Sequence, residues 1–256
     1  MKNKIRIIAR LDIKAPYVVK GIQMEGVKKL ADPNQLAKLY YEQGIDEILC
    51  IDIVASLYNR NSLLDIVMKA TDELFIPIAV GGGIRSVEDA RQLLRAGADK
   101  IAINTAAIKN PRIITELANT FGSQSVVVSI QAKQFLPNKW EVYYDCGREH
   151  TGMDVLEWAQ QVESYGAGEI LVTSVDRDGT KSGCDYSLIR AITQLVSIPV
   201  ISSGGVGKIE DVIEIVKKGK PDAIAIASAF HFNYFSISML KNTLQMADIS
   251  TRNSSY

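Results

Sequence analysis

The sequence has few of the residues that build metal sites and disulfide frameworks. Among 256 residues there are three cysteines and two histidines. Cys50, Cys146 and Cys184 are too few and too scattered for a disulfide scaffold or a cysteine-based zinc site. His150 and His231 are far apart in the chain, and we interpret them as polar surface or structural residues. We therefore expect neither a bound metal nor a cofactor.

The sequence also lacks an excess of either charge and lacks a long apolar run. Its 29 basic and 29 acidic residues give a formal net charge of zero, which argues against nucleic acid as a partner. The start, MKNKIRIIARLDI, has charges on both sides of a short apolar run, unlike a signal peptide or a membrane span. We expect no contact with a membrane and a reduced, cytoplasmic location.

Short apolar runs alternate with longer amphipathic segments along the whole chain, which is 47% hydrophobic. Strands that alternate with helices predict a parallel sheet, and eight near-continuous apolar strands predict that it closes. We therefore expect an α/β fold, a single (βα)8 TIM barrel over residues 1–256, with a flexible tail at 249–256. An open doubly wound sheet is the competing architecture, but no GxGxxG follows the first strand. The predicted strands are 5–12, 46–53, 76–81, 99–104, 125–131, 168–174, 198–203 and 222–227, with helices such as 34–43, 86–96, 154–165 and 208–218 between them.

The second half of the sequence resembles the first. QGIDEIL at 43–49 resembles YGAGEIL at 165–171, and IPIAVGGGI at 76–84 resembles IPVISSGGVG at 198–207; both shifts are 122 residues (165 − 43 and 198 − 76). A third block, 86–106, resembles 208–229 with one residue inserted. This repeat indicates a barrel made of two (βα)4 halves.

Glycine-rich segments follow equivalent strands in the two halves, where a barrel places its chemistry. Glycine lets backbone N–H groups approach an oxyanion, and a following helix start favours negative charge. One Gly-Gly pair is equally well explained as a tight turn, but two repeat-related copies favour two phosphate sites. Such sites fit a substrate with two separated phosphates, or a diphosphate bound once. The candidate contacts are Gly82, Asn104 and Thr105, then Gly204, Gly205, Ala227 and Ser228, with Asp178 and Gly179 from the VDRDGT segment at 175–180.

The candidate acid–base groups lie at the ends of the first, second and fifth strands. Asp12 ends the first strand, and its repeat counterpart is Gln131. A ring closure or elimination uses one acid and one base facing each other, yet glutamine only forms hydrogen bonds. Asp52, after the second strand, is another interior carboxylate. Lys20 lies in a predicted loop, 13–33, that can close over substrate, although a lone lysine in a loop is normally solvated.

Four charged residues begin strands at the opposite end, the foot of the barrel: Arg6, Glu47, Lys100 and Glu169. Alternation along a strand places Arg6 on the same inner side as Asp12, and Glu169 on the side of Thr173. Buried charges need partners, so we expect a neutral inward ring. The residues alone favour a structural plug over a gate for a small neutral molecule.

Together these segments resemble the cyclase subunit family of imidazole glycerol phosphate synthase. The likeness runs from RIIARLDIK through VVKG, FIPIAVGGGIRSVEDARQLLRAGADKIAINTAA and GAGEILVTSVDRDGTKSG to IPVISSGGVG and IASAFHF. It implies histidine biosynthesis, in which ammonia from a glutaminase subunit passes through the barrel to a ribulosyl aminoimidazole carboxamide nucleotide bearing two phosphates. It also implies that the four foot residues gate ammonia, that Thr173 belongs to the substrate site, and that Asp99 and Gln124 face the partner.

The sequence departs from this family at the predicted chemistry. Gln131 aligns with the second catalytic aspartate, and Arg10 stands where a cysteine is usual. Pointing inward, Arg10 would lower the pKa of Asp12. Loss of one acid or base costs about 10²–10⁴ in rate. The pattern resembles paralogues from surface-polysaccharide clusters, which help form an acetamidino group on a sugar nucleotide for lipopolysaccharide. The related isomerase of the pathway, which needs no gate, and a catalytically silent activator of glutaminase are further alternatives.

Overall fold

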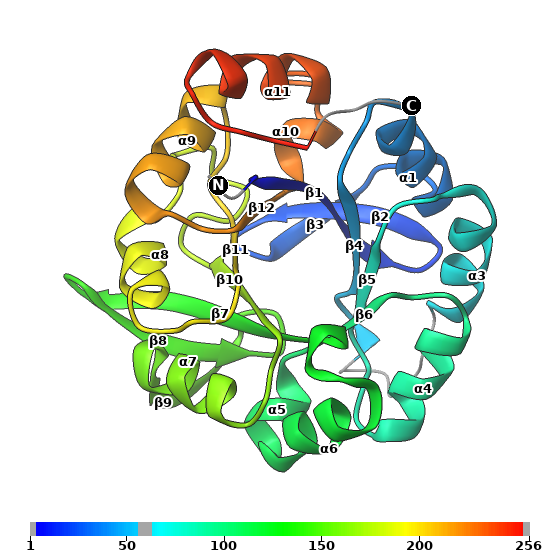
Figure 1. The fold of residues 1–256 in the computed structure, drawn as a ribbon, viewed down its shortest axis with the longest axis vertical. Coiled ribbons are helices and arrows are strands. Elements are labelled where there is room, and N and C mark those ends of the chain that lie inside the picture. Colours follow the sequence, from blue (N-terminus) through cyan, green and yellow to red (C-terminus); the bar gives the residue numbers. More distant parts are fainter. Residues whose placement is uncertain (1–3, 56–62, 253–256) are drawn as a thin grey trace.

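The computed structural model describes residues 4–55 and 63–252, and it contains a closed ring of eight parallel strands (Figure 1). The ring closes because the first and last strands pair in parallel, with Arg6 opposite Ala223. Near-continuous burial of these strands explains why each reads as an apolar run. The predicted (βα)8 barrel is confirmed. In ring order its strands are β1 (Arg6–Lys14), β4 (Glu47–Asp52), β5 (Ile78–Gly81), β6 (Lys100–Ile103), β7 (Val126–Leu136), β10 (Glu169–Ser174), β11 (Val200–Ser203) and β12 (Ala223–Ile226).

Helices surround the ring and cover its outer face (Figure 1). They bury an outer apolar layer that includes Leu93 and Trp158. Inside the ring lies a second, smaller cluster to which each of the eight barrel strands contributes, including Ile8 of β1 and Leu171 of β10. The helices are α1 (Pro33–Glu42), α3 (Leu64–Glu73), α4 (Val87–Arg95), α5 (Thr105–Lys109), α6 (Arg112–Phe121), α7 (Val155–Ser164), α8 (Tyr186–Thr193), α9 (Ile209–Glu214), α10 (Ser228–His231) and α11 (Ile237–Met246), with short helical turns η1 (Ser123–Ser125) and η2 (Ile215–Gly219).

The two halves repeat in three dimensions as the sequence predicts. Strands β4 and β10 begin 122 residues apart (169 − 47), as do β5 and β11 (200 − 78). Even local hydrogen bonds recur. Asp99 Oδ2 accepts from the N–H of Ile78 at 2.8 Å, and Asp222 Oδ2 accepts from that of Val200 at 2.9 Å. Such a carboxylate satisfies the backbone donor at a strand start.

The predicted loop 13–33 is wrong in detail, because most of it is a β-hairpin. β1 continues to Lys14, and β2 (Tyr17–Ile22) and β3 (Glu25–Lys29) follow as an antiparallel pair. A second extension was also missed. β7 runs beyond the barrel into an antiparallel sheet with β8 (Lys139–Tyr144) and β9 (Glu149–Asp154). Both extensions rise from the carboxyl ends of barrel strands, so they border the mouth of the barrel.

The chain end packs against the foot of the barrel as far as it is described. Ile249 is buried, and the N–H of Ile5 donates to the carbonyl of Ser250 at 2.8 Å. Residues 253–256 of the predicted tail lie outside the described residues. No described helix has the length and apolarity to span a membrane.

Candidate active site at the barrel mouth

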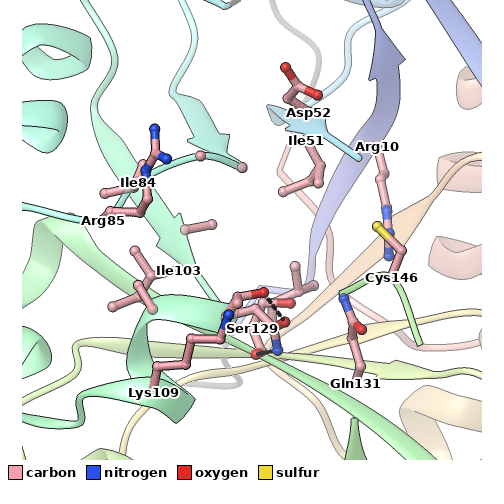
Figure 2. Close-up of a pocket in the computed structure, with 17 residues that line it drawn as sticks. Arg10, Ile51, Asp52, Ile84, Arg85, Ile103, Lys109, Ser129, Gln131 and Cys146 are labelled. Carbon is pink, nitrogen blue, oxygen red and sulfur yellow. Dashed lines mark hydrogen bonds between the residues drawn. The ribbon is translucent and has the colours of Figure 1, made fainter. Parts of the chain in front are cut away.

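A cavity of about 170 Å³ opens at the carboxyl ends of the barrel strands. In barrels of this class, the strand carboxyl ends carry the chemistry. Arg10 of β1 and Gln131 of β7 give the cavity polar lining, and two further cations, Arg85 and Lys109, also line it (Figure 2). Asp52 lines the same cavity, and its Oδ1 accepts from the N–H of Val54 at 3.0 Å.

The first predicted phosphate loop forms one wall of this cavity. Gly82, Asn104 and Thr105 all line it. Gly82 has a φ of 97°, and a Cβ at this position would lie 2.2 Å from the carbonyl oxygen of Asp52, so only glycine fits. The Thr105 hydroxyl donates to Asp145 Oδ1 at 3.1 Å. A carboxylate from the β8–β9 turn therefore contacts this loop.

The second predicted phosphate loop lies across the barrel and is almost filled. A cavity of about 20 Å³ touches the loop and the predicted contacts Asp178, Gly179, Ala227 and Ser228. Gly205 has a φ of 96°, and a Cβ there would lie 2.2 Å from the carbonyl oxygen of Gly183. The lining residues are Lys20, Asp178, Gly179, Ser203, Gly204, Gly205, Val206, Ala225, Ile226, Ala227 and Ser228.

Asp12 lies between two cations at the top of β1. Arg10 Nε donates to its Oδ1 at 2.8 Å, and Lys20 Nζ donates to its Oδ2 at 3.2 Å. Burial opposes ionisation of Asp12, but the charges of Arg10 and Lys20 outweigh burial and hold its pKa well below the ordinary value. The predicted effect of Arg10 is confirmed. A carboxylate in this state stays ionised and is a weak base.

Lys20 is buried, unlike a solvated loop lysine. Besides Asp12, its Nζ contacts both carboxylate oxygens of Asp178, at 2.9 and 2.7 Å. Hairpin β2–β3 brings it there, since β2 places Lys20 over the barrel. The sequence signal was VVKG, in which alternation puts the lysine on the same face as the first valine, Val18, which is also buried.

Gln131 lines the main cavity from β7 and is held by the β8–β9 turn. The N–H of Gly147 donates to Gln131 Oε1 at 2.7 Å. The turn has three successive residues with positive φ, Asp145 at 47°, Cys146 at 58° and Gly147 at 74°. Burial, followed by the charge of Asp12, raises the pKa of the Cys146 thiol to about 11, so the thiol stays neutral. Sequence reasoning missed this turn because its contacts are distant in the chain.

Arg10 supports the polar floor of the cavity. Its Nη1 donates to Thr173 Oγ1 and to Ser203 Oγ, both at 3.0 Å. These partners belong to β10 and β11. The sequence analysis placed Arg10 beside Asp12 but not in the cavity lining, and it missed the polar lining residues Ser129, Cys146, Arg85 and Lys109. The basic residues near the glycine loop, in GGGIR and NTAAIK, were the available signal.

The four charged residues at the foot form the ring that alternation predicts. Arg6 Nη1 donates to Glu47 Oε2 at 2.8 Å, and its Nη2 pairs with Glu169. Lys100 Nζ bridges the same two carboxylates, at 3.1 Å from Glu47 Oε1 and 2.9 Å from Glu169 Oε2. Two cations and two anions thus close a neutral ring below the apolar interior.

Two predicted partner-facing residues lie at this same end. Asp99 immediately precedes β6, and Gln124 lies in η1 just before β7. Both are exposed. Both residues therefore lie at the same end of the strands as the foot ring, and the cavity lies at the other end.

A closed barrel with polar machinery at its mouth and a charged ring at its foot defines the class: a (βα)8-barrel enzyme. Residues 6–236 match the histidine biosynthesis protein family, and the chain belongs to that family. It is similar to imidazole glycerol phosphate synthase subunit HisF of Legionella pneumophila, with 56% identity over 209 residues, 82% of this chain and 99% of the relative. The subunit of the same name from Alkaliphilus metalliredigens is 49% identical over 247 residues, 96% of this chain and 98% of that relative. The resemblance predicted from the motifs is confirmed.

Proposed function

We propose that this chain is the ammonia-using cyclase subunit of an imidazole glycerol phosphate synthase. The observation that carries the proposal is the pairing of a complete charged ring at the foot of one barrel with two glycine loops at its mouth. Along β1 the inward residues run from Arg6 through Ile8 to Arg10. A small neutral molecule admitted at the foot therefore has an apolar stretch to cross before the site.

The mouth suits a substrate that carries a phosphate at each end. The first loop has Gly82 and Thr105 beside the cations Arg85 and Lys109, and the second has Gly204 and Gly205 beside Lys20. Backbone donors on glycine and fixed cations are the usual ligands of phosphate. We infer that these two loops bind the two phosphates of a ribulosyl aminoimidazole carboxamide nucleotide.

The foot suits a glutaminase partner. The ring of Arg6, Glu47, Lys100 and Glu169 is partly exposed on its two cations, whose side chains are 15% and 18% accessible. A docked partner would cover these cations and deliver ammonia directly above them. Asp99 and Gln124 would then contact the partner.

A second candidate is an ammonia-using synthase with a different acceptor. The observation that favours it is the state of the two predicted acid–base positions: Gln131 cannot ionise, and Asp12 is held between two cations. An acceptor such as the N-acetyl group of a sugar nucleotide, converted into an acetamidino group, would fit this alternative.

The deciding assay incubates the full chain with an ammonium salt and the ribulosyl nucleotide, and follows loss of the nucleotide by absorbance. Turnover that Asp12→Asn abolishes supports the cyclase and rejects the second candidate. Silence of the unaltered chain together with turnover by Gln131→Asp supports a barrel reassigned to another acceptor. Stimulation of a glutaminase without any product identifies a silent activator and rejects both synthase proposals.

A further inference from the structure

Arg10 and Gln131 reach the main cavity from opposite sides of the barrel. Three strands separate β1 from β7 in either direction around the ring. Figure 2 shows the guanidinium of Arg10 and the amide of Gln131 pointing toward each other, with Cys146 beside them. Arg10 is 5% exposed and Gln131 is 9% exposed, so both side chains are largely enclosed by the barrel and line its cavity.

The guanidinium of Arg10 is held in one orientation and keeps one nitrogen for the cavity. Nε is committed to Asp12, and Nη1 is committed to Thr173 and Ser203. Within the described chain, Nη2 donates to no residue. A guanidinium held at two of its three nitrogens, with the third facing a cavity, is arranged to bind an acceptor there.

The amide of Gln131 is also held in one orientation by a hydrogen bond. A backbone N–H only donates, so the bond from Gly147 at 2.7 Å identifies the contacting atom as Oε1. The amide nitrogen is therefore the end turned to the cavity. It has no acceptor among residues 4–55 and 63–252. The site consequently presents two N–H donors, one charged and one neutral, from two opposite strands.

We propose that Arg10 Nη2 and Gln131 Nε2 bind the carbonyl oxygen of the acceptor and stabilise the negative charge that it gains when ammonia adds. This inference rests on the proposed function and deepens it. The nitrogen lone pair forms a bond to the carbonyl carbon, and the π electrons of the C=O bond move to oxygen. One proton of the added nitrogen ends on that oxygen, which gives a carbinolamine. Neither Arg10 nor Gln131 changes its protonation state.

Such a site works by electrostatics and needs no acid–base pair. Donors fixed before the reaction bind an alkoxide more strongly than a neutral carbonyl, and this difference lowers the barrier. Asp12 then has a positioning role, since its carboxylate holds Nε and so directs Nη2. Gln131, which aligns with the family's second catalytic aspartate, would thus supply a hydrogen bond in place of proton transfer.

The first arm of the test uses formate as a small oxyanion probe on the ¹⁵N-labelled full chain. Saturable shifts are expected in the side-chain resonances of Gln131 and Arg10. Gln131→Met should weaken formate binding at least about ten-fold, and Gln131→Glu should abolish it by repulsion. The matched control is Gln160→Met, which makes the same change at an exposed position of α7. Absence of any formate shift at Gln131 and Arg10 overturns the proposal.

The second arm measures turnover of the ribulosyl nucleotide with ammonium. Arg10→Met should lower kcat about 10²–10³-fold with little change in KM, and Arg10→Lys should recover part of the loss without altering the pH profile. An unchanged kcat in folded Arg10→Met overturns the donor site. If Arg10→Met does not fold, an unchanged kcat in Gln131→Met overturns it instead. In either case, turnover by the unaltered chain still supports the proposed function. Formate shifts in a chain that never turns over the nucleotide retain the donor site and reject the nucleotide as substrate.

Discussion

Lys20 and Asp178 form a buried ion pair between segments 158 residues apart, with Lys20 Nζ at 2.9 and 2.7 Å from the two carboxylate oxygens. The N–H of Gln23 also donates to the carbonyl oxygen of Asp178, at 2.7 Å. These contacts hold the β2–β3 hairpin against the segment that follows β10. The hairpin therefore lies closed over the second glycine loop, which explains why so little space remains there.

Replacement of Lys20 should release this hairpin. Lys20→Met leaves Asp178 buried without its cation, so the free energy of unfolding should fall by about 3 kcal/mol. Amide hydrogen exchange across residues 17–29 should become faster. Lys28→Met is the matched control, because Lys28 is exposed on β3 of the same hairpin. Combining Lys20→Met with Asp178→Asn should recover part of the lost stability. Equal exchange rates in Lys20→Met and the unaltered chain would show that this ion pair does not hold the hairpin in place.

The foot ring should behave as one coupled unit. Lys100 and Glu169 lie 2.9 Å apart; Lys100 also contacts Glu47, and Glu169 also contacts Arg6. Glu169→Gln should cost up to about 3 kcal/mol by leaving two cations with one carboxylate. The charge-balanced double change Lys100→Met with Glu169→Gln should cost less than the two single changes together. Urea unfolding of the four proteins measures this coupling, and simple additivity would show that the ring charges act independently.

His231 should make the protein less stable in mild acid. Tyr40 Oη lies 2.7 Å from its Nδ1, and burial lowers the pKa of His231 to about 4. Between pH 6.5 and 4 the unfolded chain therefore binds more protons than the folded chain, so stability falls as pH falls. The loss from this residue is roughly 3 kcal/mol.

His231→Phe should flatten the dependence of unfolding free energy on pH across this window. A phenyl ring also preserves the stacking on Tyr40, whose ring centroid lies 5.9 Å away. His150→Phe serves as the control, since the His150 side chain is 74% accessible. The control should keep the full acid sensitivity, and an unaltered slope in His231→Phe would disprove the assignment.

Two glycines with positive φ should differ sharply when changed to alanine. At Gly82 an added Cβ would lie 2.2 Å from the carbonyl oxygen of Asp52, whereas at Gly152 it would meet nothing within 4 Å. Gly152→Ala should therefore cost about 1 kcal/mol, from backbone conformation alone. Gly82→Ala should cost about 3 kcal/mol or more and reshape the first loop. Thermal unfolding compares the two variants, and similar midpoints would show that the loop yields easily.

The sequence by itself determined the barrel and both of its ends. Alternation of apolar runs with helices is a local pattern, and it located all eight strands. The period of two along a strand placed Arg6 and Asp12 on one inner face, and the repeat paired the glycine loops. These properties follow from backbone geometry, which neighbouring residues determine.

Only the tertiary structure decided which side chains of the site contact one another. Arg10 contacts Thr173 and Ser203 at sequence separations of 163 and 193 residues. Gln131 is oriented by the β8–β9 turn, which the periodic pattern of the sequence does not predict. The hairpin found in the predicted loop 13–33 is tied to the barrel by Lys20, whose carboxylate partners Asp12 and Asp178 come together only in the assembled ring. A buried charge must have a partner, but that partner is chosen by three-dimensional closure of the ring, which no local pattern encodes.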